Sequence, residues 1–548
     1  MARTHVLFTS FPAWGHARSF CILAARLVKE YPDTVFSLLL SPTLLNKAED
    51  EVSSELGHAP ADQGLRDRIR IFSSFQTTSP DPFAAFQQSI TTYAGVYNAL
   101  RVSESVTCAT TGTVFEPVEA PSLLVMDLQI SRSISGNTVP VFALGTGNAA
   151  SMIRMFGPES SGGLGDLETR IQFEAARLGV SPAEIGDKVV RSTSGKIVKL
   201  PGIPEMYDYE WAPQKVKCSY KSQQTSAYMV LLQLASDMPF ANILIGSSKF
   251  LKDCDGVVAV NAEALESESI TAMRKWFSSW DKEVYAIGPL LPSGYGAQEQ
   301  SDRGATEIKE FLERMLEQHG KHSVILVRPM LYEYMEKMSQ TLAIFLKMSF
   351  GTAFWPSDTT YMEEVVEAMI EKKFPFILAH ASRFAKLRPE FVIRVKESGV
   401  GILSKWCPQQ YILNHEATGW FLTHCGHNSV NEAIGSGIPM IAWPFRADQP
   451  EGAYHLTEAG LAVELLEVRT GEHASKPLRR NGKGAAGTRE AVGTEIRDVL
   501  DACRGEKGAQ MRRNVEKMKT EFLSAWEKEG PARKELEKFL KRYTNLNV

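Results

Sequence analysis

The sequence predicts an α/β protein built from two doubly wound parallel sheets, each covered by helices. Short apolar runs rich in Val, Ile, Leu and Phe alternate with longer amphipathic stretches, which is the pattern of parallel strands between two helical layers. A stretch dense in Gly and Pro, residues 284–305, divides this series into two halves. The chain has 548 residues, enough for two or more domains.

The first half opens with a strand, a loop and a helix. Residues 4–9 form a β-branched and aromatic run, residues 10–16 contain Pro and Gly, and residues 17–30 have helical amphipathicity. Further strands are expected in the apolar runs at Val35, Ile71, Ser122, Val139 and Gly256. We therefore predict an N-terminal domain over residues 1–285.

The second half repeats the alternation after a predicted linker at residues 286–305. A helix is expected at 307–318, and more helices at 360–372, 410–414 and 429–435; strands are expected at Met348, Phe374, Val400, Gly419 and Ile438. The predicted C-terminal domain covers residues 306–525, and a last helix within 526–548 is expected to pack back on the N-terminal domain. Ligands of such sheets bind at the carboxyl ends of the strands, so a cleft between the domains is expected.

Charge and cysteine content exclude several classes of function. With 60 Lys and Arg against 64 Asp and Glu, the net charge of −4 gives no general attraction for nucleic acid or anionic lipid. The seven cysteines are widely spaced and form no Cys-x-x-Cys pair, which favours reduced thiols over disulfides or zinc. No apolar run is long enough for a transmembrane segment or a signal peptide. We expect a cytoplasmic monomer.

Residues 406–449 gather small and polar residues around a junction between a strand and a helix. The predicted helix opens at Asn428 and Ser429, with Glu432 at the spacing of a capping box. Free backbone N–H groups at a helix N-terminus suit a diphosphate. From this pattern alone, a capped helix without a ligand is an equal alternative.

This stretch resembles the donor-binding signature of the UDP-dependent glycosyltransferases of the plant and fungal small-molecule type, and it matches the 44-residue length without a gap. Other segments follow the family pattern in order: FPAWGH at 11–16, LLVMD at 123–127, VPVFALGT at 139–146, GVVAVN at 256–261, IGPLLP at 287–292 and SFGT at 349–352. The resemblance implies the GT-B architecture, with two Rossmann-like domains facing a cleft. It also implies an enzyme that uses a UDP-sugar.

Carried over by position, the resemblance implies a complete donor site. Trp406 would stack on the uracil and the backbone of Cys407 would read its edge, while Gln409 and Glu432 would bond the ribose hydroxyls. The residues expected around the diphosphate are Ser349, Thr352, His424, Gly426, Asn428 and Ser429.

Around the sugar, the resemblance implies that Asp448 and Gln449 bind hydroxyl groups and that Thr146 lies nearby. Gln at position 449 is similar to glucosyl-transferring members. His427 stands where the plant signature has Trp, and Arg446 stands where an aromatic or small residue is common. Glucose is therefore the first expectation, and xylose or glucuronate stays open beside it.

His16 follows the first strand, where its side chain can point into a cleft. Histidine suits a general base near neutral pH, and a partner carboxylate fixes its tautomer. A lone His in a loop is more often structural, but the resemblance makes Asp127 that partner. The implied reaction is a direct displacement with inversion at the anomeric carbon. UDP would leave toward the helix N-terminus and His424, with no metal and no cofactor beyond the co-substrate.

Two rivals remain open. A nucleotide-sugar epimerase or hydrolase on the same fold would need carboxylates at the anomeric centre, and a non-catalytic sensor would keep the donor site without transfer. The acceptor class expected is a small lipophilic metabolite such as a terpenoid, sterol or phenol. Aromatic residues that either line its pocket or belong to the core are Phe72, Phe75, Phe83, Phe86, Tyr93 and Tyr97.

A block of 21 residues, 327–347, departs from the family pattern. That pattern leads us to expect SVIL at 323–326 to run straight into MSFGT at 348–352. The block begins with Val, whose codons start GT, and ends with Lys, one of whose codons ends AG. A retained intron in a eukaryotic gene is one hypothesis and a true amphipathic insertion the other, and the sequence of the spliced transcript distinguishes them.

Overall fold

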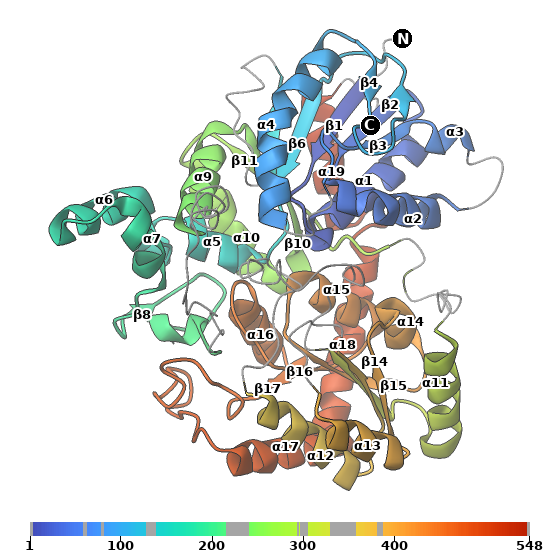
Figure 1. The fold of residues 1–548 in the computed structure, drawn as a ribbon, viewed down its shortest axis with the longest axis vertical. Coiled ribbons are helices and arrows are strands. Elements are labelled where there is room, and N and C mark those ends of the chain that lie inside the picture. The colour runs from blue at the N-terminus through green and yellow to red at the C-terminus, as the bar shows by residue number, and fades with distance from the viewer. Residues whose placement is uncertain are drawn as a thin grey trace, which may run out of the picture.

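The computed structural model describes residues 4–57, 63–77, 82–127, 139–214, 240–292, 295, 305–328, 358–380 and 387–544. Two large sheets, each with helices around it, lie in separate halves of the molecule (Figure 1). The N-terminal sheet has seven strands in the order β11-β10-β7-β6-β1-β2-β3, and the C-terminal sheet has six in the order β14-β13-β12-β15-β16-β17. All strand pairs within both sheets are parallel. The prediction of two doubly wound α/β units is confirmed.

The N-terminal strands are buried along almost their whole length because both faces of the sheet are covered by helices. They are β1 Thr4–Thr9, β2 Thr34–Leu39, β3 Ile69–Phe72, β6 Leu123–Asp127, β7 Val141–Gly145, β10 Gly256–Ala262 and β11 Glu283–Gly288. The helices of this half are α1 Trp14–Glu30, α2 Leu45–Leu56, α3 Gln63–Arg66, α4 Pro82–Arg101, α5 Ala149–Phe156, α6 Leu167–Leu178, α7 Pro182–Arg191, α9 Phe240–Asp253 and α10 Glu263–Ser278. Short 3₁₀ turns occupy Pro42–Leu44, Glu159–Ser161 and Asp208–Trp211, and two small antiparallel ribbons pair β4 Val106–Thr107 with β5 Val114–Phe115 and β8 Ile197–Val198 with β9 Met206–Tyr207.

Two elements of this half differ from the sequence prediction. Helix α1 begins at Trp14 rather than at residue 17, because the carbonyl of Ala13 accepts the N–H groups of His16 and Ala17 at 3.0 and 3.1 Å. His16 therefore lies in the first turn of a helix and not in a loop. Strand β11 extends through Gly288, so residues 286–288 of the predicted linker belong to the sheet.

The strands of the C-terminal sheet are β12 Val324–Arg328, β13 Phe376–Ala379, β14 Gly401–Ser404, β15 Thr418–Thr423, β16 Met440–Ala442 and β17 Ala462–Glu464. Its helices are α11 Thr306–His319, α12 Thr359–Glu371, α13 Pro389–Glu397, α14 Gln409–Asn414, α15 His427–Ser436, α16 Gln449–Glu458, α17 Arg489–Arg504 and α18 Glu506–Ser524. The strand expected at Met348 lies outside the described residues. So does the block 327–347, except for Val327 and Arg328, which end β12 and pair with Leu422 and Thr423 of β15.

The last helix, α19 Pro531–Tyr543, lies against β11 of the N-terminal sheet (Figure 1). Phe539 is buried there, with its ring centroid 4.8 Å from that of Phe142 and 5.2 Å from that of Tyr285. The chain thus begins in the N-terminal half, forms the C-terminal half and ends with α19 packed on the N-terminal half.

The two segments that connect the halves both contact one side chain of α1. The guanidinium of Arg26 donates a hydrogen bond to the carbonyl of Leu291, on the segment that follows β11. The same guanidinium lies 4.3 Å from the ring centroid of Trp526, on the segment between α18 and α19. Both connections therefore pack beside the second half of α1.

None of the helices that the structure describes is both long and apolar enough to span a bilayer. The cysteines within the described ranges are buried and free, namely Cys21, Cys108, Cys254, Cys407, Cys425 and Cys503. Cys218 lies outside those ranges.

Candidate active site

The candidate base and its partner meet at the carboxyl ends of two neighbouring strands. Asp127 is the last residue of β6, and α1 begins just beyond the adjacent β1. His16 Nδ1 lies 2.6 Å from Asp127 Oδ2, and the N–H of Phe11 donates to the same oxygen at 3.2 Å. A proton on Nδ1 facing the carboxylate leaves the lone pair of Nε2 for a substrate hydroxyl, which is the tautomer that a general base needs.

Thr146, which the resemblance places near the sugar, follows β7 and is close to the same imidazole. Its Oγ1 lies 3.1 Å from His16 Nδ1. The hydroxyl thus helps to fix the ring of the candidate base, and this contact was not predicted from the sequence.

The charges around His16 favour its protonated form despite its burial. Burial alone would lower the pKa of His16, but the charge of Asp127 and its hydrogen bond outweigh burial, and the charge of Asp448 acts in the same direction. The pKa of His16 is therefore raised above its ordinary value. Burial raises the pKa of Asp448 as well, and the His427 N–H and the charge of His16 oppose that shift. His16 and Asp448, from different halves of the molecule, are near enough to interact.

The raised pKa predicts the pH dependence of turnover. Since His16 accepts a proton only when it is neutral, kcat/KM is expected to rise with pH and to level off above an apparent pKa higher than about 6.5. An Asp127→Asn variant is expected to move this limb to lower pH, because it removes the charge that raises the pKa. The measurement is a profile from about pH 5 to about pH 9 with an acceptor that does not titrate. An identical limb in both proteins would contradict the assignment.

The helix expected to hold the diphosphate, α15, begins at His427 and not at Asn428, and it has no capping box. Gly426 is its N-cap residue and no side chain caps it, so Ser429 is inside the first turn. A Cβ at position 426 would lie 2.5 Å from His424 Nε2, which explains why the strand turns into the helix through glycine. The first-turn N–H groups of Asn428 and Ser429 have no intrahelical acceptor and suit an anion.

His424 lies beside this helix start with an unsatisfied polar atom. Its Nδ1 is buried and has no hydrogen-bond partner among the described residues. Burial, with the positive charge of Arg328, lowers the pKa of His424 to about 3, so the ring is neutral. A buried polar atom without a partner is costly, and a phosphate oxygen that accepts a hydrogen bond from this imidazole would satisfy it.

The residues expected at the ribose lie together where α14 meets the middle of α15. Gln409 Nε2 donates to the carboxylate of Glu432, and Gln410 Nε2 donates to it at 3.2 Å. The Oε1 of Gln409 is buried without a hydrogen-bond partner in the described part of the chain. Next to them, Cys407 is buried and Trp406 is half-buried, as a ring that stacks on a ligand would be.

Two of the residues expected at the sugar, Asp448 and Gln449, lie at the start of α16. Asp448 is the N-cap residue of α16, and its carboxylate accepts the N–H of His427 at 3.2 Å. Gln449 is only 1% exposed, and its Oε1 accepts the N–H groups of Phe445 and Arg446 at 2.9 and 3.2 Å. Its carbonyl oxygen therefore holds the loop before α16, and the expected bond from Gln449 to a sugar hydroxyl stays a prediction.

The unusual His427 is occupied by a contact between the two halves. Its Nε2 lies 3.2 Å from the carbonyl oxygen of Val260 in β10 and 3.1 Å from Nδ2 of Asn431. Burial lowers the pKa of His427 to about 4, so it is neutral and can donate to that carbonyl. Ser349 and Thr352 lie outside the described residues, and the structure does not place them.

Several residues that sequence reasoning missed connect the halves around this site. Asn148 Nδ2 donates to the carbonyl of Asp448 at 2.6 Å, and Arg18 forms an ion pair with Glu432. Asn148 had a detectable signal, since its side chain caps α5 by accepting the N–H of Ser151 at 2.7 Å. Arg18 had none, because its partner is 414 residues away in the sequence.

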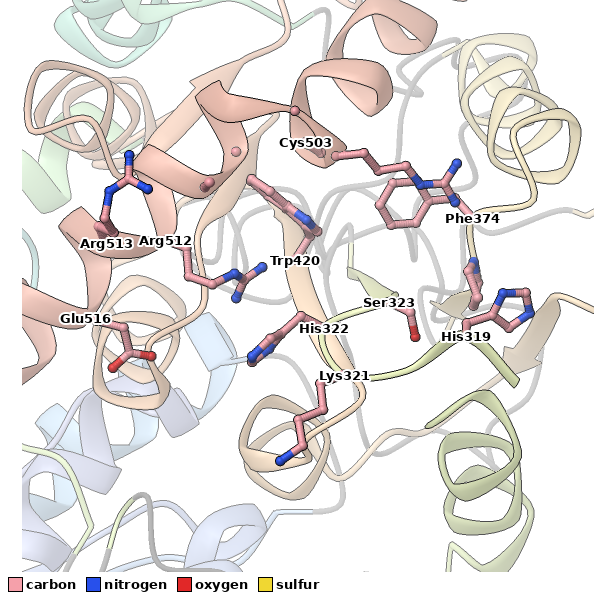
Figure 2. Close-up of a pocket in the computed structure, with 15 residues that line it drawn as sticks. His319, Lys321, His322, Ser323, Phe374, Trp420, Cys503, Arg512, Arg513 and Glu516 are labelled. Atoms are coloured by element: carbon pink, nitrogen blue, oxygen red, sulfur yellow. The ribbon is translucent and has the colours of Figure 1, made fainter. Parts of the chain in front are cut away.

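Within the described ranges, no three His, Cys, Asp or Glu side chains form a group that suits a metal ion. A separate cavity of about 680 Å³ lies at the opposite edge of the C-terminal sheet, where β12 and β13 begin (Figure 2). Its lining includes His322, Trp420, Arg512 and Glu516. Since none of the predicted donor or catalytic residues lines it, we do not assign it to the active site.

A family model and several solved structures of known proteins match this chain. The family model described as "UDP-glucoronosyl and UDP-glucosyl transferase" matches residues 333–475. The solved structure of a transferase from Siraitia grosvenorii in complex with UDP aligns with a TM-score of 0.63 at 17% identity, over 99% of this chain and 100% of that one. Medicago truncatula UGT71G1 complexed with UDP-glucose aligns with a TM-score of 0.64 at 17% identity, over 99% of both chains. The fold is the GT-B architecture.

The proteins that are similar in sequence are also named as glycosyltransferases that use a UDP-sugar. UDP-glycosyltransferase eriJ of Hericium erinaceus is 28% identical over 96% of both chains. UDP-glucosyltransferase 45 of Panax ginseng is 28% identical over 53% of this chain and 56% of its own. These matches support the UDP-glycosyltransferase family for this chain, which is an enzyme that transfers a sugar from a UDP-sugar.

Proposed function

We propose that this enzyme transfers glucose from UDP-glucose, with inversion, to a hydroxyl group of a small lipophilic acceptor. The observation that carries the proposal is the His16–Asp127 pair, which faces Asp448 of the predicted sugar site across the two halves. A single base beside the sugar suits direct displacement, whereas an epimerase or hydrolase would use carboxylates at the anomeric centre.

In the proposed reaction, His16 Nε2 takes the proton of the acceptor hydroxyl while the oxygen attacks the anomeric carbon. The bond from that carbon to the diphosphate breaks on the opposite face, so an α-linked donor gives a β-glycoside. Asp127 stabilises the imidazolium that forms. The N–H groups of α15 and the imidazole of His424 receive the charge that develops on UDP, and no metal is needed for that task.

The apolar surroundings of His16 support a lipophilic acceptor. The ring of Phe11 lies 5.4 Å from the ring of His16 and 5.4 Å from that of Phe86, measured between centroids. Of the aromatic residues expected at this pocket, the described ones are buried, and the side chain of Phe83 is outside the described set. Phe72, Phe86, Tyr93 and Tyr97 are part of the hydrophobic core, which is the other of the two roles expected for them. A terpenoid, sterol or phenol would place its hydroxyl at His16. The free, buried cysteines fit a reducing compartment, which supports a cytoplasmic location.

The test is a screen of UDP-glucose, UDP-xylose and UDP-glucuronate against a panel of hydroxylated lipophilic acceptors. A β-glycoside together with UDP supports the proposal, and the donor with the highest kcat/KM identifies the sugar. Turnover without acceptor would support a hydrolase or epimerase, and donor binding without any turnover would support a sensor. An α-glycoside would contradict inversion.

A further inference from the structure

Arg18 is a buried cation on the helix that carries the candidate base, but it does not contact that base. Its Nε donates to Glu51 of α2 at 2.9 Å, and its Nη1 donates to Glu432 of α15. The side chain of Arg18 is 13% exposed, and both carboxylates are 8% exposed. A buried charge without a partner is costly. Glu51 belongs to the same half as Arg18, whereas the ion pair with Glu432 forms only when the two halves are together.

A second hydrogen bond, about one helical turn away, joins the same two helices. Asn428 Nδ2 donates to the carbonyl of Gly15 at 2.9 Å. Asn428 and Glu432 are neighbours on one face of α15, as residues four apart on a helix are, and Gly15 and Arg18 are three apart on α1. A Cβ at position 15 would lie 3.0 Å from Asn428 Nδ2, so glycine permits this approach. Helix α1, which carries the candidate base, and helix α15, which is expected to bind the diphosphate, are thus held in a fixed relative position by two contacts.

The carboxylate of Glu432 retains room for a ligand in this arrangement. One oxygen accepts Arg18 and Gln410, and the other accepts Gln409. An ionised carboxylate has about four acceptor positions, so at least one remains for a hydroxyl donor. The buried Oε1 of Gln409 offers another acceptor beside it.

We propose that Arg18 is a positioning residue for the UDP-sugar. It orients the carboxylate of Glu432 toward the ribose hydroxyls, and it ties that carboxylate to the helix of the base. Arginine suits this task because its rigid fork binds two carboxylates from different nitrogens, which a single ammonium group does less well. The inference rests on the proposed function, since it takes Glu432 as the group that binds the ribose.

The test compares the affinities of UDP and 2′,3′-dideoxy-UDP by titration calorimetry, a readout that needs no turnover. Arg18→Met is expected to weaken UDP binding by about 10- to 100-fold, because it removes one partner of a buried pair. The same variant should change the affinity for the dideoxy nucleotide by less than about twofold, since that ligand has no ribose hydroxyls that could donate a hydrogen bond to Glu432. Glu51→Gln, the matched control, keeps the ion pair with Glu432 and should leave both affinities near those of the natural protein.

Arg18→Lys retains a cation and serves if the Met variant does not fold; its loss of affinity should be smaller and again confined to UDP. Equal weakening of both nucleotides would mean that Arg18 only supports the fold, and tighter UDP binding would mean that it competes with the ribose. Either result overturns the inference and leaves the proposed function intact. A natural protein that binds neither nucleotide would instead refute the proposed function.

Discussion

Replacing His16 with alanine is expected to lower kcat by roughly 100- to 10,000-fold, the usual contribution of a general base. The reason is the geometry of the pair: with Nδ1 at 2.6 Å from Asp127, only Nε2 is available to take the acceptor proton. Thr146, which is expected near the sugar, contacts His16 at Nδ1, but the alanine substitution leaves the Thr146 hydroxyl itself in place. The KM for the UDP-sugar should therefore change by less than about threefold. Steady-state kinetics with the best acceptor of the screen measures both values.

His319→Ala is the matched control for that experiment, because His319 is an exposed histidine at the far edge of the C-terminal sheet. Its kcat should equal that of the natural protein. A His16→Ala variant with full transfer activity would refute the proposed base.

Replacing Phe539 with alanine is expected to lower the free energy of unfolding by about 3–5 kcal/mol, as for other fully buried phenylalanines. Phe539 is 3% exposed, and its ring contacts Phe142 of β7 and Tyr285 of β11. The cavity left by the truncation would separate α19 from the edge of the N-terminal sheet. Urea unfolding followed by tryptophan fluorescence gives the difference, since Trp526 and Trp280 pack against the same core.

Lys541→Ala tests the same helix without touching the core, because Lys541 is exposed. Its effect should stay within about 0.5 kcal/mol. An equally stable Phe539→Ala variant would show that α19 contributes little to the N-terminal half.

Most strands could be predicted from the sequence because parallel strands between two helical layers are buried and mostly apolar. The run at 122–129 contains β6, with Asp127 at its end, but it was the family resemblance that paired Asp127 with His16. The predictions were wrong where glycine has a local structural role. Gly15 suggested a loop but lies in α1, and Gly288 suggested a linker but ends β11.

The contacts around the donor site could not be predicted in the same way. The spacing of Ser429 and Glu432 predicted a capping box, yet tertiary contacts take the carboxylate of Glu432 for Arg18 and for the glutamines of α14. Such pairs depend on how two domains face each other, and no local pattern encodes that arrangement. The bond from the Phe445 N–H to the side chain of Gln449 is a local contact that the sequence pattern did not predict either.

Both segments that connect the two halves pack on Arg26, so this residue marks a point about which the halves can rotate. Arg26 is ten residues beyond His16, which is about 15 Å along a helix. If the C-terminal half turns about this pivot by about 10°, the groups facing His16 move by roughly 2.6 Å, more than a hydrogen bond tolerates. The bonds from Gly15 and Arg18 to α15 would then break while those at Arg26 barely change. A rotation of about 10° is therefore enough to break both contacts between α1 and α15.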